Sequence, residues 1–174
     1  MNSNKDFNSI YRSHCDLVFN LALNYLHSVQ EAEELTQDVF VKVFHEVENF
    51  RGESQIKTWI YRITINLCLD RIKSAQRKRR FSLLRYISDG FVSIQPAEFN
   101  HPGIQLEQKE ATELILKEIQ QLPGKQQTAL ILKSIDGLSQ KEIAEIMDIN
   151  VKAVESLLSR ARAKLKTKLK NREG

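Results

Sequence analysis

The sequence contains little cysteine, glycine and proline, and it has no long uninterrupted run of apolar residues. Its 174 residues include 2 Cys, 6 Gly and 3 Pro. The two cysteines, Cys15 and Cys68, are far apart, which fits a reducing cytoplasm better than a disulfide-stapled secreted domain. No stretch approaches the roughly 18 to 20 apolar residues of a membrane span, and the N-terminus lacks the apolar core of a signal peptide. We therefore expect a soluble, cytoplasmic protein.

The period-two alternation typical of β-strands is also nearly absent. Apolar residues recur instead at steps of three and four, which is the spacing that gives an α-helix one apolar face. The sequence therefore predicts an all-α fold. Hydrophobic residues make up 41% of the chain, which is enough for two compact helical cores but not for one large core.

The first predicted domain spans residues 1–80 and contains three helices. The first apolar stripe runs from Phe7 to Tyr25, and the second runs from Ala32 to Val47. Gly52 breaks the pattern, and Ser54 is the expected N-cap of a third helix. The third stripe lies within residues 56–67, after which the sequence becomes strongly basic.

Residues 81–106 lack a helical period and are predicted to be an irregular linker to a second domain over residues 107–174. Pro123 and Gly124 separate the first two helices of that domain. Ser139 and Glu142 have the spacing of a capping box, which predicts the start of a short helix. Asn150 is the expected N-cap of a longer helix that begins at Val151. A short helix, a tight turn and a longer helix have the proportions of a helix-turn-helix unit.

The formal net charge of +4 is too small to establish a nucleic-acid partner, so the distribution of charge matters more. On the last helix, basic and small polar residues lie opposite the apolar stripe, a combination that fits the major groove of duplex DNA. The alternative is a solvated basic helix. The candidate DNA-contacting residues on this helix are Lys152, Ser156, Ser159, Arg160 and Arg162.

The third helix carries a second polar and basic face, formed by Arg62, Asn66, Lys73 and Arg77. Cationic side chains there could neutralise the phosphates of a nucleic-acid strand, while the amide could recognise a base edge. A solvated face that balances the apolar stripe is the alternative interpretation.

The second helix is acidic near its start, where it carries Glu31, Glu33, Glu34 and Asp38. Acidic residues at this end stabilise a helix through its dipole, so a purely structural explanation exists. The other explanation is a protein partner. A protein that binds another protein and DNA at the same time needs an acidic surface for the protein partner and basic surfaces for the DNA, which is the distribution seen here.

Two segments carry a family resemblance. The segment EAEELTQDVFVKVFHEVENFRGESQIKTWIYRITINLCLDRIKSAQRKRR resembles the region-two domain of bacterial extracytoplasmic-function (ECF) sigma factors. The segment LPGKQQTALILKSIDGLSQKEIAEIMDINVKAVESLLSRARAKLKTKL resembles their region-four domain. Helix-turn-helix modules like the second segment also occur in response regulators, whereas both segments in this order are specific to sigma factors.

The resemblance implies roles for particular residues in binding core RNA polymerase and promoter DNA. It implies that the acidic helix docks on the clamp helices of the largest polymerase subunit, and that the second domain meets the flap of the second subunit. The expected polymerase contacts are Glu34, Leu35, Gln37 and Asp38. Phe40 belongs to the same pattern and is more easily explained as a core residue.

For DNA, the resemblance implies that Asn66 reads an extruded base of the minus-10 element and that Arg62, Lys73 and Arg77 contact phosphates. Trp59, on the apolar stripe, is expected in the core. The helix over residues 151–166 would read the minus-35 element. Many family members carry basic residues just after Val154, where this chain has Glu155, Ser156 and Leu157. The promoter sequence therefore cannot be copied from a relative.

No arrangement of residues indicates catalysis. The histidines are scattered, the cysteines lack metal-ligand spacing, and there is no P-loop or nucleophile motif. We expect no enzyme activity, no cofactor or metal, and no small-molecule substrate. The resemblance implies a bacterial transcription-initiation factor with an anti-sigma partner, often membrane-bound in this family. Two alternatives remain: a regulator that binds an operator without polymerase, and a helical adaptor for RNA or acidic proteins.

Overall fold

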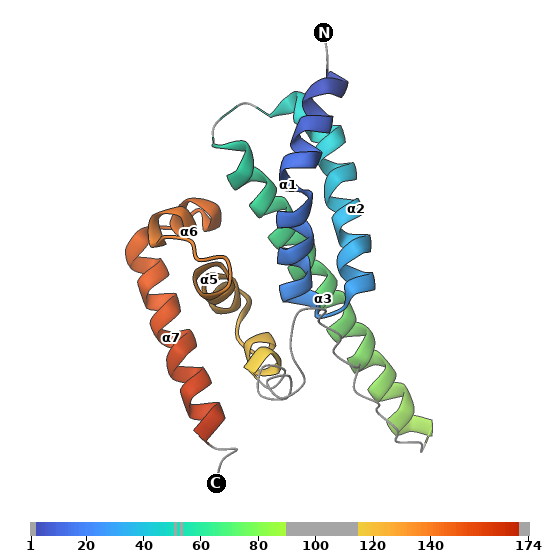
Figure 1. Cartoon of the computed structure of the whole chain (residues 1–174). Helices are drawn as coiled ribbons and strands as arrows, with labels where there is room; N and C mark the ends of the chain where they lie inside the picture. Colours follow the sequence, from blue (N-terminus) through green and yellow to red (C-terminus); the bar gives the residue numbers. More distant parts are fainter. Residues whose placement is uncertain (1–2, 51, 53, 90–114, 171–174) are drawn as a thin grey trace, which may run out of the picture.

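The structure is a computed structural model that describes residues 3–50, 52, 54–89 and 115–170 (Figure 1). Every regular element in these ranges is a helix, which confirms the all-α prediction. Most of the predicted linker, from residue 90 onwards, lies outside the described residues. The domain boundaries at residues 80 and 106 therefore stay predictions.

The first unit consists of three α-helices, α1 (Ser3–Leu26), α2 (Val29–Glu46) and α3 (Ile56–Asp89), with a short 3-10 helix (Val47–Asn49) after α2. Helix α1 packs against both α2 and α3 (Figure 1). The apolar stripes meet in one core, where Val18, Leu21, Leu35, Val39 and Ile60 are at most 1% exposed. Burial of a large aliphatic side chain contributes roughly 1.5–3 kcal/mol, so this core holds the three helices together.

Short connections orient the three helices. His27 has a positive φ of 56° and ends α1, and the Ser28 side chain then accepts a hydrogen bond from the Glu31 N–H to cap α2. Gly52, with a φ of 71°, lies in the loop before α3, as its role as a breaker predicts.

The expectation that Ser54 caps α3 is wrong. The helix begins at Ile56, and the Gln55 carbonyl accepts the first helical hydrogen bond, from Trp59 N.

Helix α3 is 34 residues long and continues to Asp89. The first part of the segment predicted as irregular linker, residues 81–89, is therefore helical. The expectation of irregular structure there was wrong because it depended on an apolar period. A run of residues with good intrinsic helix propensity, such as the basic residues over 77–80, continues a helix without one.

The second unit contains a helical stretch over residues 115–120, followed by α5 (Gly124–Ser134), α6 (Gln140–Met147) and α7 (Val151–Lys170). Helix α7 packs against α5 and α6. The fully buried side chains of this unit include Ile131, Leu132, Ile143 and Val154. Because α6 and α7 are joined by a turn of three residues, the unit has the arrangement of a helix-turn-helix.

Both predicted caps in the second unit are confirmed. Ser139 and Glu142 form a reciprocal capping box, with the Ser139 N–H donating to Glu142 Oε2 at 2.8 Å. These hydrogen bonds hold the pKa of the Glu142 carboxyl below its usual value. Asn150 Oδ1 accepts from the Ala153 N–H at 2.8 Å and caps α7. The caps fix where each helix of the pair begins, and therefore which residues of α7 face outward.

Replacing Ser139 with Ala should lower the free energy of unfolding by roughly 0.5–2 kcal/mol, because α6 loses its N-cap. Urea denaturation followed by circular dichroism at 222 nm measures this change. Ser159→Ala, which alters an exposed position in the middle of α7, is the matched control and should leave stability nearly unchanged. Equal stability of the two variants would show that the capping box contributes nothing.

Candidate nucleic-acid interface

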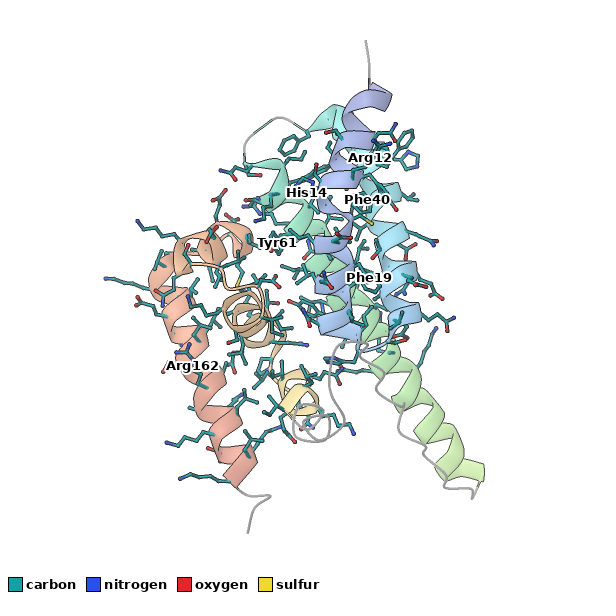
Figure 2. The ribbon with its side chains drawn as sticks, viewed as in Figure 1. Arg12, His14, Phe19, Phe40, Tyr61 and Arg162 are labelled. Atoms are coloured by element: carbon teal, nitrogen blue, oxygen red, sulfur yellow. The ribbon has the colours of Figure 1, made fainter. Side chains whose placement is uncertain are left out.

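Helix α7 presents a continuous basic and polar surface. Its buried side consists of Val154, Leu158 and Ala161, which pack into the core of the second unit. The opposite side faces solvent, and α7 lies at the edge of the molecule, away from α1 and α2 (Figure 1). The predicted DNA-contacting residues on this side are exposed, except that Ser156 is half-buried: Lys152, Ser156, Ser159, Arg160 and Arg162. Of these, Arg162 is labelled on α7 in Figure 2.

Two of these residues are joined by a hydrogen bond. Arg160 Nη2 donates to Ser156 Oγ at 2.7 Å, one helical turn away. A flexible arginine held in this way loses less conformational freedom when its guanidinium binds a base edge or a phosphate. Ser156 therefore orients Arg160.

The basic residue Lys168, near the C-terminal end of α7, has a structural role. Its Nζ lies 2.9 Å from Glu118 Oε2, and the Glu118 side chain is only 2% exposed. Lys168 also donates to Gln121 Oε1. These contacts join α7 to the segment that precedes α5. Sequence reasoning placed Lys168 in a uniformly basic tail because its acidic partner is about 50 residues away in the chain.

The predicted minus-10 face on α3 is exposed at three of its four residues. Asn66, Lys73 and Arg77 are open to solvent. Arg62 is half-buried and points to the second unit, where Nη2 donates to the Glu145 carbonyl at 2.6 Å and Nε donates to the Ile146 carbonyl at 3.2 Å. The structure therefore leaves Asn66, Lys73 and Arg77 accessible and places Arg62 in a contact with α6.

Trp59 is half-buried and stacks near Phe50, with ring centroids 4.9 Å apart.

The acidic surface of α2 includes three of the four predicted polymerase contacts. Glu34, Gln37 and Asp38 are exposed. Leu35, the fourth predicted contact, is only 1% exposed and its side chain belongs to the core, so its role as a polymerase contact stays a prediction. Its position in the apolar stripe of the second helix already indicated this burial, and the resemblance led to the other assignment. Phe40 is likewise a core residue, at 4% exposure.

Sequence reasoning missed that Arg71 of α3 pairs with two of these acidic residues. Its guanidinium lies 2.9 Å from Asp38 Oδ2 and 3.4 Å from Glu34 Oε2, and it also donates to the Glu31 carbonyl. The sequence placed Arg71 within a basic cluster, and only the packing of α3 against α2 shows its partners. Both carboxylates are therefore held in position on the surface of α2.

Helix α2 also exposes two apolar residues further along. Val41 is 58% exposed and Phe44 is 49% exposed. The Phe44 ring packs edge-on against Phe7 of α1, with ring centroids 5.2 Å apart. Towards its C-terminal end, the solvent-facing side of α2 therefore has two apolar residues beside the charged pair Lys42–Glu46. Sequence reasoning did not find this exposure, because Phe44 lies next to Val43 of the buried stripe.

Within the ranges that the structure describes, no three His, Cys, Asp or Glu side chains lie close enough together to hold a metal ion. In the same ranges, no helix combines the length and apolar character needed to cross a membrane. Burial raises the pKa of the Cys68 thiol to about 12, so this cysteine behaves as a core residue.

Two family models match the chain, and both describe sigma factors. Sigma-70 region 2 matches residues 10–78, and Sigma-70 region 4 matches residues 112–165. The fold and its two surfaces thus define a two-domain DNA-binding protein of the sigma-70 class.

Relatives of known function define the family further. The chain is 32% identical over 155 residues to the RNA polymerase sigma-H factor of Pseudomonas aeruginosa, covering 83% of this chain and 76% of that protein. It is 30% identical over 167 residues to the ECF RNA polymerase sigma-E factor of Escherichia coli K12, covering 95% and 87%. The chain belongs to the ECF family of RNA polymerase sigma factors. It directs transcription initiation and is not an enzyme.

A solved structure has a similar fold over nearly the whole chain. It is the co-crystal structure of the sigma factor RpoE with the anti-sigma factor NepR from Bartonella quintana, with a TM-score of 0.65, 26% identity, and coverage of 95% of this chain and 98% of that one. The structure of CnrH in complex with the cytosolic domain of CnrY also has a TM-score of 0.65, at 21% identity, covering 97% and 90%. The second similarity concerns the fold alone.

Replacing Arg71 with Met should lower the free energy of unfolding by about 1 kcal/mol or less, because partly exposed ion pairs contribute little and are screened by salt. Urea denaturation at low and high ionic strength measures both effects. Lys73→Met removes a more exposed pair, Lys73 with Asp70 at 3.7 Å, and should have a smaller effect. A loss from Arg71→Met that does not shrink in salt would contradict an ionic origin.

Proposed function

We propose that three surfaces of this sigma factor divide the work of initiation between them. Helix α2 binds core RNA polymerase, the exposed face of α3 holds the opened minus-10 strand, and α7 reads the minus-35 element in duplex DNA. The observation that carries the proposal is the separation of charge between helices: acidic residues gather on α2, and basic residues gather on α3 and α7. Acting with polymerase, such a factor works in the cytoplasm.

Helix α2 is suited to a protein partner. Glu34, Gln37 and Asp38 lie exposed on it, followed by the exposed apolar residues Val41 and Phe44. A surface with an apolar part beside fixed charges matches the usual composition of protein interfaces better than that of DNA interfaces. By family resemblance, the partner is the clamp-helix region of the largest polymerase subunit, and the second unit meets the flap of the second subunit.

The face of α3 is suited to a single strand. Lys73 and Arg77 are exposed, so these basic side chains can neutralise phosphates on either side of a captured base. The Asn66 amide offers both a donor and an acceptor to the Watson–Crick edge of a base that has left the stack.

Helix α7 is suited to the major groove, with Lys152, Ser159, Arg160 and Arg162 exposed around its outer side. Glu155 is also exposed there. A carboxylate repels phosphate and accepts only from donors such as the cytosine amino group. The chain should therefore read a minus-35 sequence that differs from the sequence read by relatives with a basic residue at this position.

An anti-sigma partner is part of the proposal. Two solved structures similar to this chain are complexes of a sigma factor with NepR and of CnrH with the cytosolic domain of CnrY. We expect a protein of the same kind to hold this chain inactive, and a membrane-bound form would fit a signal from outside the cytoplasm.

In vitro transcription tests the proposed function directly. Purified core polymerase from the source organism is incubated with fragmented genomic DNA, with and without the chain, and RNA 5′ ends are mapped. Discrete new start sites that share two spaced upstream elements are expected. Absence of such sites would overturn the promoter-reading role and favour a factor that binds an operator without polymerase.

Asn66→Ala should reduce promoter opening by about 5- to 150-fold while polymerase binding is retained, because a lost base contact costs roughly 1–3 kcal/mol. Permanganate reactivity of unpaired thymines measures opening, and co-purification measures polymerase binding. Gln76→Ala changes another exposed amide on α3 and serves as the control. Equal opening by both variants would remove Asn66 from the minus-10 site.

Ser156→Ala should weaken binding to duplex minus-35 DNA by a few-fold, since Arg160 loses the partner that orients it. Arg160→Ala should cost about 10-fold or more. In the double variant the effect of Ser156→Ala should disappear, because its only role is to position Arg160. Thr167→Ala, at an exposed hydroxyl on the same helix, is the control, and additive effects in the double variant would contradict the positioning role.

A further inference from the structure

Arg71 connects α3 to the acidic surface of α2 through both ends of its guanidinium. Helices α2 and α3 pack against each other (Figure 1). Arg71 Nη2 lies 2.9 Å from Asp38 Oδ2, and Nη1 lies 3.4 Å from Glu34 Oε2 and 3.2 Å from the Glu31 carbonyl oxygen. One planar group therefore reaches three acceptors that are spread over two turns of α2.

The Glu34 carboxylate is held by two donors. Arg71 donates to Oε2, and Gln30, one turn earlier on α2, donates from Nε2 to Oε1 at 3.3 Å. Each carboxylate oxygen can accept more than one hydrogen bond, so both can still accept from a partner. The Glu34 and Asp38 side chains are 54% and 60% exposed. Both carboxylates are therefore fixed in direction and open to solvent at the same time.

Fixed directions matter for binding because exposed acidic side chains otherwise sample several rotamers. Ordering each such side chain in a complex lowers the affinity by a few-fold. Arginine is suited to hold them, since its planar fork loses little freedom for each hydrogen bond that it forms. Arg71 therefore orders in the free chain two side chains that a partner would otherwise have to order.

The packing of α2 against α3 does not depend on these polar contacts. Leu35 and Val39 of α2 and Ile60 and Ile65 of α3 belong to one buried core. Burial of large aliphatic side chains contributes more to stability than partly exposed ion pairs do. The main effect of Arg71 is therefore on the directions of the surface carboxylates.

We infer that Arg71 is a positioning residue for polymerase binding, because it holds Glu34 and Asp38 in the directions in which basic side chains of the polymerase contact them. The surface remains acidic, since the four carboxylates at its start outnumber the single guanidinium: Glu31, Glu33, Glu34 and Asp38. This inference rests on the proposed function, since it requires that α2 binds polymerase.

A positioning role predicts a change in the dissociation rate of the complex. Removing a cation from an acidic surface strengthens its long-range attraction to a basic partner, so association should be unchanged or faster. Loss of the fixed directions weakens the contacts made within the complex, so dissociation should be faster. A residue that only stabilises the fold would change neither rate while the chain remains folded.

The first experiment measures both rates by biolayer interferometry, with the full chain and core RNA polymerase from the source organism. Arg71→Met should dissociate about 5-fold faster or more, because two side chains then have to be ordered on binding. Arg71→Lys keeps the charge without the fork and should recover part of this difference. Lys78→Met removes another exposed cation of α3 and is the control. Dissociation of Arg71→Met at the rate of the control would overturn the inference, as would a change in association alone.

The second experiment removes the side chains that Arg71 positions. The double variant Glu34→Ala with Asp38→Ala should bind polymerase more weakly, and Arg71→Met added to it should have no further effect on dissociation. An equal effect of Arg71→Met with and without the two carboxylates would overturn the positioning role. Circular dichroism of each variant confirms that it is helical before binding is compared.

Run-off transcription supplies a readout that separates binding from promoter recognition. Arg71→Met should raise the concentration of the chain needed for half-maximal transcription and leave the maximum unchanged, because Arg71 acts on polymerase binding. A lower maximum at an unchanged half-maximal concentration would overturn the inference.

The outcomes also separate this inference from the proposed function. If the double variant at Glu34 and Asp38 binds polymerase as tightly as the unaltered chain, the proposed role of α2 fails. If that variant binds weakly while Arg71→Met binds normally, only the positioning role of Arg71 fails.

Discussion

Helix α3 is the element on which the rest of the structure depends, because its different sides face three environments: the core of the first unit, the second unit, and solvent. Its apolar side, with Ile60 fully buried, completes the core formed with α1 and α2. Its first turns carry Thr58, Tyr61 and Arg62, which contact the second unit. Its remaining surface, including Asn66, faces solvent. With 3.6 residues per turn, these faces are kept apart only while the helix stays continuous.

The charged residues of this protein divide into those that pair within the chain and those that remain available to partners. Arg71 and Lys168 look identical in sequence to their basic neighbours, yet the first holds Glu34 and Asp38 and the second holds the buried Glu118. The Arg71 pairs hold the carboxylates on the surface of α2 in position, and the Lys168 pair connects α7 to the segment that precedes α5. Unpaired charges such as those on the outer side of α7 supply the electrostatic attraction that DNA binding needs. The net charge alone does not reveal this division.

Much of the fold could be predicted from the sequence because its signals are local. The capping box at Ser139, the N-cap at Asn150 and the break at Gly52 involve residues within a few positions of one another, and the structure has all three. The end of α3 could not be predicted in this way, because helix propensity carried it past the point where its apolar period ended. Leu35 shows the opposite case: its apolar period correctly predicted that its side chain is buried, whereas its assignment as a polymerase contact rests on the resemblance alone.

By itself, the sequence determined the helical fold, the two units, the family, and the faces of α3 and α7 that carry basic residues. These features depend on periodicity and on motifs, which are properties of neighbouring residues. Only the tertiary structure decided that Arg62 contacts the carbonyls of α6, that Tyr25 reaches Thr128, and that Arg71 holds the acidic residues of α2. Each of these pairs joins residues between 30 and 105 positions apart, and no local pattern records which distant surface a side chain will meet.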